Sequence, residues 1–358
     1  MNQQPMLLVD DSLLAGTVNV MPRQWLAGLR VKTFTSGERP AISPELQAAT
    51  AILTRSVSPI DAEVLARAAN LRAVATTSSG TDHIDSAALQ TLDVPLFTGR
   101  GGNAPGVHDW VLWALWRAWG LPLTSGGARG KTVVVVGCGA VGRLVTTALG
   151  QWGAEVLQVD PPRARRDVNF AGVSLDEAIA RRPDAVTLHV PLTHRGPDAT
   201  AHLLNATRLQ HLRGAAVLNA ARGPVLDEQK AATMRKASHL SFLALDTFAN
   251  EPTPSRAVIE AADLATAHIA GHSIEGKLRV SALPIQGLRD HLGLAKTVDL
   301  DDQIRARRQN PPGGIGPAIN PLVALDGASR ALKDGAAPFK TLRAQHWRCE
   351  MQPLWGQR

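Results

Sequence analysis

The chain has 358 residues, of which 38 are Lys or Arg, 31 are Asp or Glu, two are Cys and none is Tyr. Its length predicts two or three domains, and its 44% hydrophobic content excludes a disordered chain. Two cysteines are too few for a disulfide framework and have no zinc spacing, so we expect no metal and a reduced, cytoplasmic setting. The sequence shows no apolar run long enough for a membrane span, and we expect no membrane partner.

The net charge of +7 raises the question of a nucleic-acid partner. From Asp301 onward the chain carries nine Lys or Arg and five Asp or Glu, which accounts for more than half of the excess. These basic residues are scattered and form neither a compact block nor a recognition-helix pattern. We therefore expect a solvated surface there and no nucleic-acid partner.

Short aliphatic or β-branched runs alternate with segments of helical period along most of the chain. A first series lies at residues 6–10, 51–56, 71–77 and 94–99, and a second at 132–137, 155–160, 185–190, 215–220 and 240–246. Such alternation predicts βαβ units, and nearly all-apolar strands are typical of parallel sheets covered on both faces. The pattern predicts an α/β protein with two doubly wound parallel-sheet domains.

Between the two series, residues 106–120 carry Trp110, Trp113, Trp116 and Trp119 at a spacing of three. On a helix this spacing gives a slowly rotating aromatic stripe. Large aromatic side chains chiefly supply buried area, so we expect a packed helix at the domain junction, with the stripe in a core or a subunit interface.

The C-terminal part begins with a change in composition. Residues 310–321 contain four Pro and three Gly, which predicts a loop or linker. Beyond it, we expect a single helical piece at residues 338–352, too small to form a core of its own. The sequence therefore predicts that this part packs on its own chain or on a partner.

A glycine-rich turn follows the strand at residues 132–136. Gly137, Gly139 and Gly142 form a G-x-G-x-x-G pattern that includes Ala140 and Val141 and opens a segment of helical period. In this context the glycines allow a tight turn, close approach of a pyrophosphate and close packing of strand and helix, and the helix N-terminus provides amide donors. The turn predicts a dinucleotide cofactor.

Asp160 ends the next strand, 23 residues after Gly137. A carboxylate there can accept hydrogen bonds from the adenosine ribose hydroxyls and repels a 2′-phosphate, which favours NAD over NADP. Arg163, Arg165 and Arg166 follow at once and weaken that preference, because cations could bind the 2′-phosphate.

Four later segments each place a polar residue at or just beyond a strand end, where open α/β sheets bind ligands. They are residues 188–193, 219–228, 245–252 and 267–277. Together they resemble the D-isomer-specific 2-hydroxyacid dehydrogenase family, whose catalytic Arg, Glu and His come in this chain order. The resemblance implies that Arg222 binds the substrate carboxylate, that Glu251 is the acid partner, and that His268 is the general acid/base.

Within that family, residues 54–57, 78–85, 160–166 and above all 268–277 resemble the erythronate-4-phosphate dehydrogenases. The resemblance implies NAD-dependent oxidation of 4-phospho-D-erythronate to (R)-3-hydroxy-2-oxo-4-phosphobutanoate in pyridoxal 5′-phosphate biosynthesis. It also implies a homodimer. The expected organisation is a flavodoxin-like substrate domain at 1–103 and 272–295, a Rossmann NAD-binding domain inserted at 104–271, and a short dimerisation-like segment at 296–358.

The resemblance assigns further site residues. It gives Ser56, Ser78 and His272 to the substrate, and it gives Asp160, Val190, Ala220, Ala221, Arg222, Asp246 and Gly271 to NAD. The chain departs from the family pattern at four positions: His272 replaces the usual Tyr, Ser78 replaces Thr, Val190 stands where Thr is common, and Ala267 replaces the Pro before the catalytic histidine. For the substrate phosphate we expect a cation, with Arg55 beside Ser56 as first candidate and Lys277 as second.

Two alternatives stay open at this point. One is another D-2-hydroxyacid dehydrogenase, such as a phosphoglycerate dehydrogenase or a hydroxypyruvate/glyoxylate reductase, which would share Arg222, Glu251 and His268. The other is a non-catalytic NAD-sensing binding protein of the same fold, which can retain these three residues. The segment at 268–277 argues against the first alternative, and turnover would exclude the second.

Overall fold

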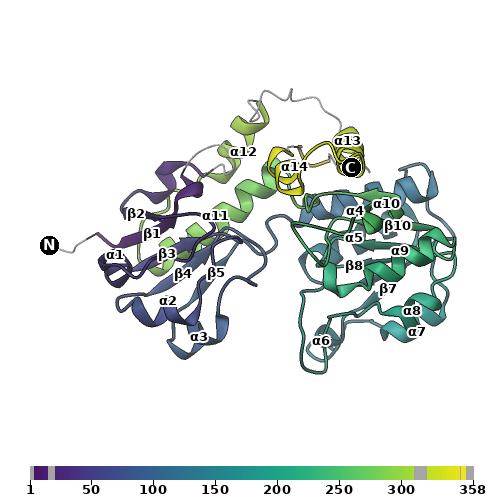
Figure 1. Ribbon diagram of the computed structural model, residues 1–358, viewed down its shortest axis with the longest axis horizontal. Helices are drawn as coiled ribbons and strands as arrows, with labels where there is room; N and C mark the ends of the chain where they lie inside the picture. Colours follow the sequence, from purple (N-terminus) through teal and green to yellow (C-terminus); the bar gives the residue numbers. More distant parts are fainter. Residues whose placement is uncertain (1–3, 15–20, 310–320, 347, 352–358) are drawn as a thin grey trace. The chain divides into compact units, whose positions relative to one another are not determined.

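The computed structural model describes residues 4–14, 21–309, 321–346 and 348–351 (Figure 1). The chain forms two compact units. The first consists of Met1–Asn103 and Ser273–Pro317, and the second of Ala104–His272 and Ala318–Arg358. The latter part of the chain is thus divided between the two units and forms no third one among the described residues.

The first unit is built on a parallel sheet with the strand order β2-β1-β3-β4-β5. Its strands are β1 (Met6–Asp10), β2 (Arg30–Phe34), β3 (Ala51–Thr54), β4 (Ala73–Thr76) and β5 (Leu96–Thr98). This is the flavodoxin-like order, and it reverses between β1 and β3, where such sheets open a crevice at the carboxyl ends of the strands. The sequence did not reveal β2, because this edge strand is partly exposed along its length and lacks an apolar run.

Helices of the first unit are α1 (Pro44–Ala48), α2 (Ala62–Arg67), α3 (Ser86–Thr91), α11 (Ile274–His291) and α12 (Leu300–Gln309), with 3-10 turns at Asp11–Leu13 and Arg23–Leu26. Side chains of Ser43, Asp61 and Asp85 accept backbone N–H groups at the starts of α1, α2 and α3. These caps fix where the helices begin. The long helix α11 packs on β4 and β5 and buries Leu278, Ile285 and Leu288, so the returning chain contributes to the core of this unit.

The second unit has a six-stranded parallel sheet in the order β11-β10-β9-β8-β6-β7. Its strands are β6 (Thr132–Val136), β7 (Glu155–Val159), β8 (Ala185–Leu188), β9 (Ala216–Asn219), β10 (Phe242–Leu245) and β11 (Leu264–Ala265). The order reverses between β6 and β8, so a ligand crevice is expected where β6 and β8 end. The predicted fold class, two doubly wound parallel-sheet domains followed by a helical segment, is confirmed.

Both faces of this sheet are buried. Along β6, Val133 and Val135 belong to one core and Val134 and Val136 to the other, because successive side chains of a strand point to opposite faces. The helices are α4 (Ala104–Trp119), α5 (Ala140–Trp152), α6 (Pro161–Ala164), α7 (Leu175–Ala180), α8 (Ala206–Gln210), α9 (Glu228–Lys236), α10 (Arg256–Ala261), α13 (Pro321–Lys333) and α14 (Phe339–Gln345), with a 3-10 turn at Gly223–Val225. This double burial explains the nearly all-apolar strands.

The tryptophan-rich helix is α4. Trp110 and Trp113 have no exposed surface and lie in the core that α4 and α5 share with one face of the sheet. Trp116 and Trp119 pack at the edge of that core. The tryptophan stripe therefore packs in the core of the second unit.

The C-terminal part differs from the prediction of a single helix. Pro321 starts α13, which packs on α4, α10 and β11, and α14 follows at Phe339. Proline suits the first position of a helix because its missing N–H would lack a helical partner there anyway, so the proline that indicated a linker instead begins a helix. Residues 310–320 of the predicted linker, and Trp347 and Gln352 of the predicted helix, lie outside the described residues.

Among the described residues, no helix is both long enough and apolar enough to cross a membrane.

Candidate active site

The glycine-rich turn lies at the reversal point of the second sheet. Gly137 has φ +88°, and a Cβ there would stand 2.6 Å from the carbonyl oxygen of His189 at the end of β8. A Cβ on Gly142 would come within 2.0 Å of the Gly137 oxygen, so helix and strand approach more closely than any side chain allows. A Cβ on Gly139, by contrast, would meet open space. The turn therefore exposes backbone at the start of α5, where no side chain caps the helix, as a bound pyrophosphate requires.

Asp160 lies beside this turn, just after β7. Its Oδ2 accepts the backbone N–H of Cys138 at 2.9 Å, and its Oδ1 accepts the N–H of Arg163 at 2.9 Å. These two bonds fix the carboxylate between the glycine-rich turn and the start of α6. A carboxylate has about four acceptor positions, so lone pairs remain for ribose hydroxyls.

The three arginines after Asp160 have partners within the protein. Arg163 donates to Asp167 and stacks on Phe170, with its guanidinium 4.5 Å from the ring centre. Arg165 forms an ion pair with Asp198, and Arg166 donates to the carbonyl oxygen of Pro162. These contacts weaken the case for a 2′-phosphate site, because the guanidinium groups are already engaged.

His268 and Glu251 form a hydrogen-bonded pair: the His268 Nδ1 and the Glu251 Oε2 are 2.7 Å apart. Since a carboxylate can only accept, Nδ1 carries the hydrogen and Nε2 keeps the lone pair that a general base needs. The other oxygen, Oε1, accepts the N–H of Phe248 at 3.0 Å. Burial raises the pKa of Glu251, but the bond and charge of His268, the Phe248 N–H and the charge of Arg343 outweigh it, so its pKa lies below the ordinary value.

The loop that carries His268 is fixed by Asp246, which follows β10 and is almost fully buried. Asp246 accepts the N–H of Ile269 at 2.8 Å and of Ala270 at 3.0 Å, as well as the hydroxyl of Thr266 at 2.6 Å. His268 itself has φ +55°, a conformation that costs energy in a residue with a side chain and persists when neighbouring contacts enforce it. Burial raises the pKa of Asp246, and the charge of His268 opposes that rise.

Arg222 lies in the turn after β9. The side chain of Asn219 braces this turn by donating to the Arg222 carbonyl at 2.9 Å and accepting the N–H of Ala221 at 3.1 Å. A Cβ on Gly223 would stand 1.9 Å from the Phe248 carbonyl carbon, so the Arg222 turn packs backbone to backbone against the turn that leads to Glu251. This packing brings two of the predicted catalytic residues onto adjoining turns.

The first unit holds a second group of predicted site residues, at its own reversal point. Arg55 follows β3 and donates from Nη1 to the Ser12 hydroxyl at 2.9 Å. The hydroxyls of Ser12 and Ser58 both donate to the buried carboxylate of Asp10, each at 2.5 Å. Ser56 is exposed beside Arg55.

Ser78 lies on the same edge, two residues after β4. Its hydroxyl donates to the Gly80 carbonyl at 2.7 Å and lies 2.9 Å from the Thr76 hydroxyl, which lies 3.0 Å from His83 Nε2. Because the Ser78 hydrogen is used on Gly80, Thr76 donates to Ser78, and His83 must donate to Thr76. Burial lowers the pKa of His83 to about 4, although Asp82 opposes the effect, so the ring is neutral near pH 7. Lys277, the second phosphate candidate, is nearly buried on α11.

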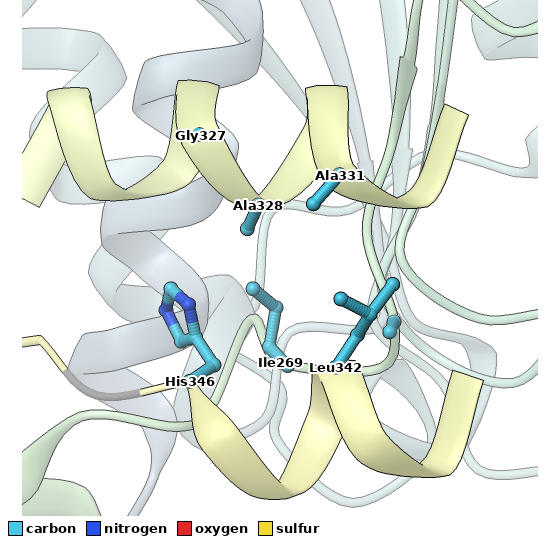
Figure 2. Close-up of a pocket in the computed structure, with 7 residues that line it drawn as sticks. Ile269, Gly327, Ala328, Ala331, Leu342 and His346 are labelled. Atoms are coloured by element: carbon cyan, nitrogen blue, oxygen red, sulfur yellow. The ribbon is translucent and has the colours of Figure 1, made fainter. Parts of the chain in front are cut away.

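Behind His268 lies an apolar pocket of about 210 Å³ (Figure 2). Its lining consists of Ala267, Ile269, Gly327, Ala328, Ala331, Leu342 and His346. Figure 2 shows α13 and α14 facing it from opposite sides, with Ile269 of the His268 loop between them. The two C-terminal helices thus form a wall behind the loop that carries His268.

Sequence reasoning missed several residues that support the site. Glu228 accepts the N–H of Ala249 at 2.9 Å in the turn that carries Glu251, and Trp110 donates to Thr266 at 2.9 Å behind Asp246. Glu228 was visible in sequence as an acid just after the Arg222 turn. The pairing of Trp110 with Thr266 and that of Asp10 with Ser58 had no sequence signal, because the partners lie 156 and 48 residues apart.

With this geometry established, comparisons with known proteins identify the family. The model of the D-isomer specific 2-hydroxyacid dehydrogenase NAD-binding domain matches residues 106–270. An erythronate-4-phosphate dehydrogenase of Salinibacter ruber is 38% identical over 320 residues, 87% of this chain and 75% of that protein. The chain belongs to the D-isomer specific 2-hydroxyacid dehydrogenase family. The predicted family and the predicted NAD-dependent enzyme class are therefore confirmed.

Further comparisons agree with this assignment. An erythronate-4-phosphate dehydrogenase of Aeromonas salmonicida is 37% identical over 73% of this chain and 70% of that protein. A glyoxylate reductase from Paecilomyes thermophila superposes with a TM-score of 0.66 at 21% identity, covering 83% of this chain and 98% of that chain. A formate dehydrogenase from Staphylococcus aureus, solved with NAD, gives a TM-score of 0.60 at 20% identity and covers 83% and 98%. At these identities the two structures support the shared fold alone.

The residues present fit the NAD that the family's cofactor domain binds. Gly137 and Gly142 allow the close turn, Gly139 leaves open space above it, and the start of α5 has no side-chain cap. Asp160 lies where a carboxylate is required to bind the ribose hydroxyls, and its oxygens can accept further hydrogen bonds. The predicted cofactor, NAD, is confirmed.

Proposed function

We propose that this dehydrogenase oxidises 4-phospho-D-erythronate to (R)-3-hydroxy-2-oxo-4-phosphobutanoate, a step of pyridoxal 5′-phosphate biosynthesis. The hydrogen bond between His268 and Glu251 supports the chemistry, because it gives the protein an oriented base on the loop after β11. The named relatives, at 34–38% identity over most of the chain, support the choice of substrate.

His268 acts as the general base on the C2 hydroxyl. Its Nε2 takes the hydroxyl proton while C2 loses hydride and becomes a ketone carbon, and the Nδ1–H stays bonded to Glu251. The carboxylate of Glu251 then stabilises the imidazolium. NAD, when bound, supplies the acceptor for the hydride.

Arg222 binds the substrate carboxylate in this proposal. A guanidinium matches a carboxylate with two parallel hydrogen bonds, which fixes the orientation of the neighbouring C2. Asn219 and Gly223 set the turn that carries Arg222. Asp160, Val190, Ala220, Ala221, Asp246 and Gly271, together with the glycine-rich turn, complete the proposed NAD contacts.

The first unit recognises the remainder of the substrate. Arg55 would bind the phosphate, held in orientation by Ser12 and Asp10. Ser56 and Ser78 would contact the substrate hydroxyls and oxygens, as would His272, the last residue of the first segment of the second unit. Since Ser78 already donates to Gly80, it is available to accept a hydrogen bond from a substrate hydroxyl.

A panel of phosphorylated and unphosphorylated D-2-hydroxy acids, followed by the appearance of NADH, tests the proposal. We expect 4-phospho-D-erythronate to give the highest kcat/KM, and His268→Ala to lower kcat by about a thousandfold through loss of the base. His211→Ala, which removes an exposed histidine at the end of α8, serves as control. A preference for 3-phosphoglycerate or glyoxylate would favour another enzyme of the family, and NADH binding without turnover would favour a sensor.

Arg55→Ala tests the phosphate assignment. The variant should raise KM for the phosphorylated acid about tenfold more than KM for an unphosphorylated analogue, because only the former loses a charge-assisted contact. Arg39→Ala, which removes an exposed arginine paired with Asp61 and Glu63, is the matched control. Equal effects of Arg55→Ala on both acids would dismiss the assignment.

We further propose a cytoplasmic homodimer, on the basis of the enzymes that the chain resembles. Sedimentation of the full chain gives the oligomeric state directly. A monomer at micromolar concentration would contradict this part of the proposal.

A further inference from the structure

Arg348 lies in the segment after α14, and its side chain has no exposed surface. Its Nη2 donates to the carbonyl oxygens of Gly106 and Ala270, each at 2.7 Å, and its Nη1 lies 3.4 Å from the Asp109 Oδ2. Burial lowers the pKa of this guanidinium, and Asp109 opposes that change. A charge so fully removed from water persists only where hydrogen bonds and an opposite charge compensate it.

Asp109, on α4, is itself fixed by the same segment of chain. Its Oδ2 accepts the backbone N–H of Met351 at 2.8 Å, and its Oδ1 lies 3.0 Å from the His108 Nδ1. Arg348 and Met351 therefore converge on one buried carboxylate. The contacts tie the last described residues of the chain to the start of α4.

The contact with Ala270 connects this anchor to the loop that carries His268. The Ala270 N–H donates to the Asp246 Oδ2 at 3.0 Å, and its carbonyl accepts from Arg348 at 2.7 Å. The backbone at Ala270 is thus held from both sides, two residues after His268 and one residue before Gly271. His268 has the strained φ of +55°, which needs such enforcement.

We propose that Arg348 is a positioning residue of the active site, which fixes the loop of His268 and Gly271 by holding the Ala270 carbonyl. The C-terminal segment then completes the catalytic loop of its own chain: α13 and α14 supply the apolar wall behind it (Figure 2), and Arg348 supplies the polar anchor. The inference rests on the proposed function only for the catalytic role of His268.

The decisive comparison is Arg348→Lys against Arg289→Lys. Arg289 is also buried and also donates to backbone carbonyls, those of Trp25, Ala27 and Ala295, but it lies in the first unit. Lysine keeps the charge and loses the planar fork that joins two carbonyls. Both variants should unfold at a lower temperature than the wild type, because each loses hydrogen bonds from a buried guanidinium to backbone carbonyls. The two variants are therefore comparable in their loss of stability.

Only Arg348→Lys should loosen the loop. We expect the amide hydrogens of Ile269 and Ala270 to exchange at least about tenfold faster, NADH to bind about tenfold more weakly, and kcat to fall about tenfold or more with little change in KM. Arg289→Lys should leave all three unchanged. Unaltered exchange and NADH affinity in Arg348→Lys, or equal losses of kcat in both variants, would overturn the proposal.

The double variant Asp109→Asn/Arg348→Met covers the case in which an unpaired buried charge prevents folding. Removing both charges should restore the melting temperature relative to Arg348→Met and still leave rapid exchange at Ala270 and a low kcat. Recovery of kcat along with stability would refute a positioning role. Amide exchange and NADH binding can be measured without substrate. A wild-type protein that turns over no phosphorylated acid would therefore refute the proposed function, while the exchange and NADH-binding data would still test the role of Arg348.

Discussion

Each unit has a buried aspartate at or just after the end of a strand, and the two aspartates hold different things. Asp10, at the end of β1, accepts the hydroxyls of Ser12 and Ser58. Asp246, just after β10, accepts the backbone N–H groups of Ile269 and Ala270. Asp10 also accepts the backbone N–H of Ser12, and Asp246 also accepts the Thr266 hydroxyl, so the contrast is one of balance: Asp10 orders mainly hydroxyl groups, and Asp246 orders mainly the backbone.

This difference agrees with the proposed roles of the two sites, which are substrate binding at the carboxyl ends of the first sheet and proton transfer at those of the second. A hydroxyl network can shift by a bond rotation to fit a polar substrate, whereas proton transfer at His268 tolerates little displacement. The units also share a feature, since each has a half-buried histidine whose Nε2 lies 3.0 Å from a threonine hydroxyl: His83 with Thr76, and His189 with Thr187. Burial lowers the pKa of His83 to about 4 and that of His189 to about 3, so both rings are neutral at pH 7.

The largest expected effect concerns His83 and acid stability. Because its pKa is depressed from 6.5 to about 4, the unfolded chain binds the proton first as the pH falls. The stability is therefore fully present above pH 6.5 and is lost progressively down to about pH 4, by about 3 kcal/mol in all. Urea unfolding at pH 7 and pH 4.5 measures this effect. Between the two pH values, the unfolding free energy of His83→Asn should fall by less than that of the wild type. An equal fall would show that His83 does not cause the acid destabilisation.

Asp246→Asn should damage catalysis next most. The amide nitrogen would face a backbone N–H, which displaces the loop and should lower kcat by about a hundredfold. Asp184→Asn provides a control. Asp184 also accepts a backbone N–H, that of Thr132, but it does so at the amino end of β6 in the same sheet. Steady-state kinetics and near-ultraviolet circular dichroism would separate loss of activity from loss of fold, and equal kcat losses in both variants would contradict the assignment.

Asp10→Asn should act on binding instead. Loosening Ser12 and Arg55 should raise KM for the phosphorylated acid about tenfold and leave kcat within about twofold. Asp61→Asn, which changes an exposed helix cap in the same unit, is the control. A large fall in kcat with unchanged KM would contradict the contrast between the two edges.

The smallest expected effect is that of Ala267→Pro, which restores the proline usual before the catalytic histidine. A proline whose backbone fits reduces the freedom of the unfolded chain and should add about 0.5 kcal/mol to the unfolding free energy, measured by thermal denaturation. Ala270→Pro would remove the N–H that donates to Asp246 and should destabilise the protein. Equal effects of the two prolines would show that the His268 loop is not held as described.

Much of the second unit could be predicted from its sequence. The apolar runs at β6 to β10 are nearly continuous because both sheet faces are buried, and Gly137, Arg222 and Glu251 follow strand ends at recognisable positions. The partly exposed β2 and the two-residue β11 left no such pattern. Helix α13 was missed because Pro321 resembled a linker residue.

By itself, the sequence determined the α/β class and the cofactor turn and led to the proposed catalytic residues, because these depend on local period and on residues at strand ends. Only the tertiary structure decided what holds them in place. Arg55 and Ser12 are 43 residues apart, and Arg348 and Gly106 are 242 apart. Contacts over such separations arise when the sheets close and helices cover them, and no local pattern of residues encodes that closure.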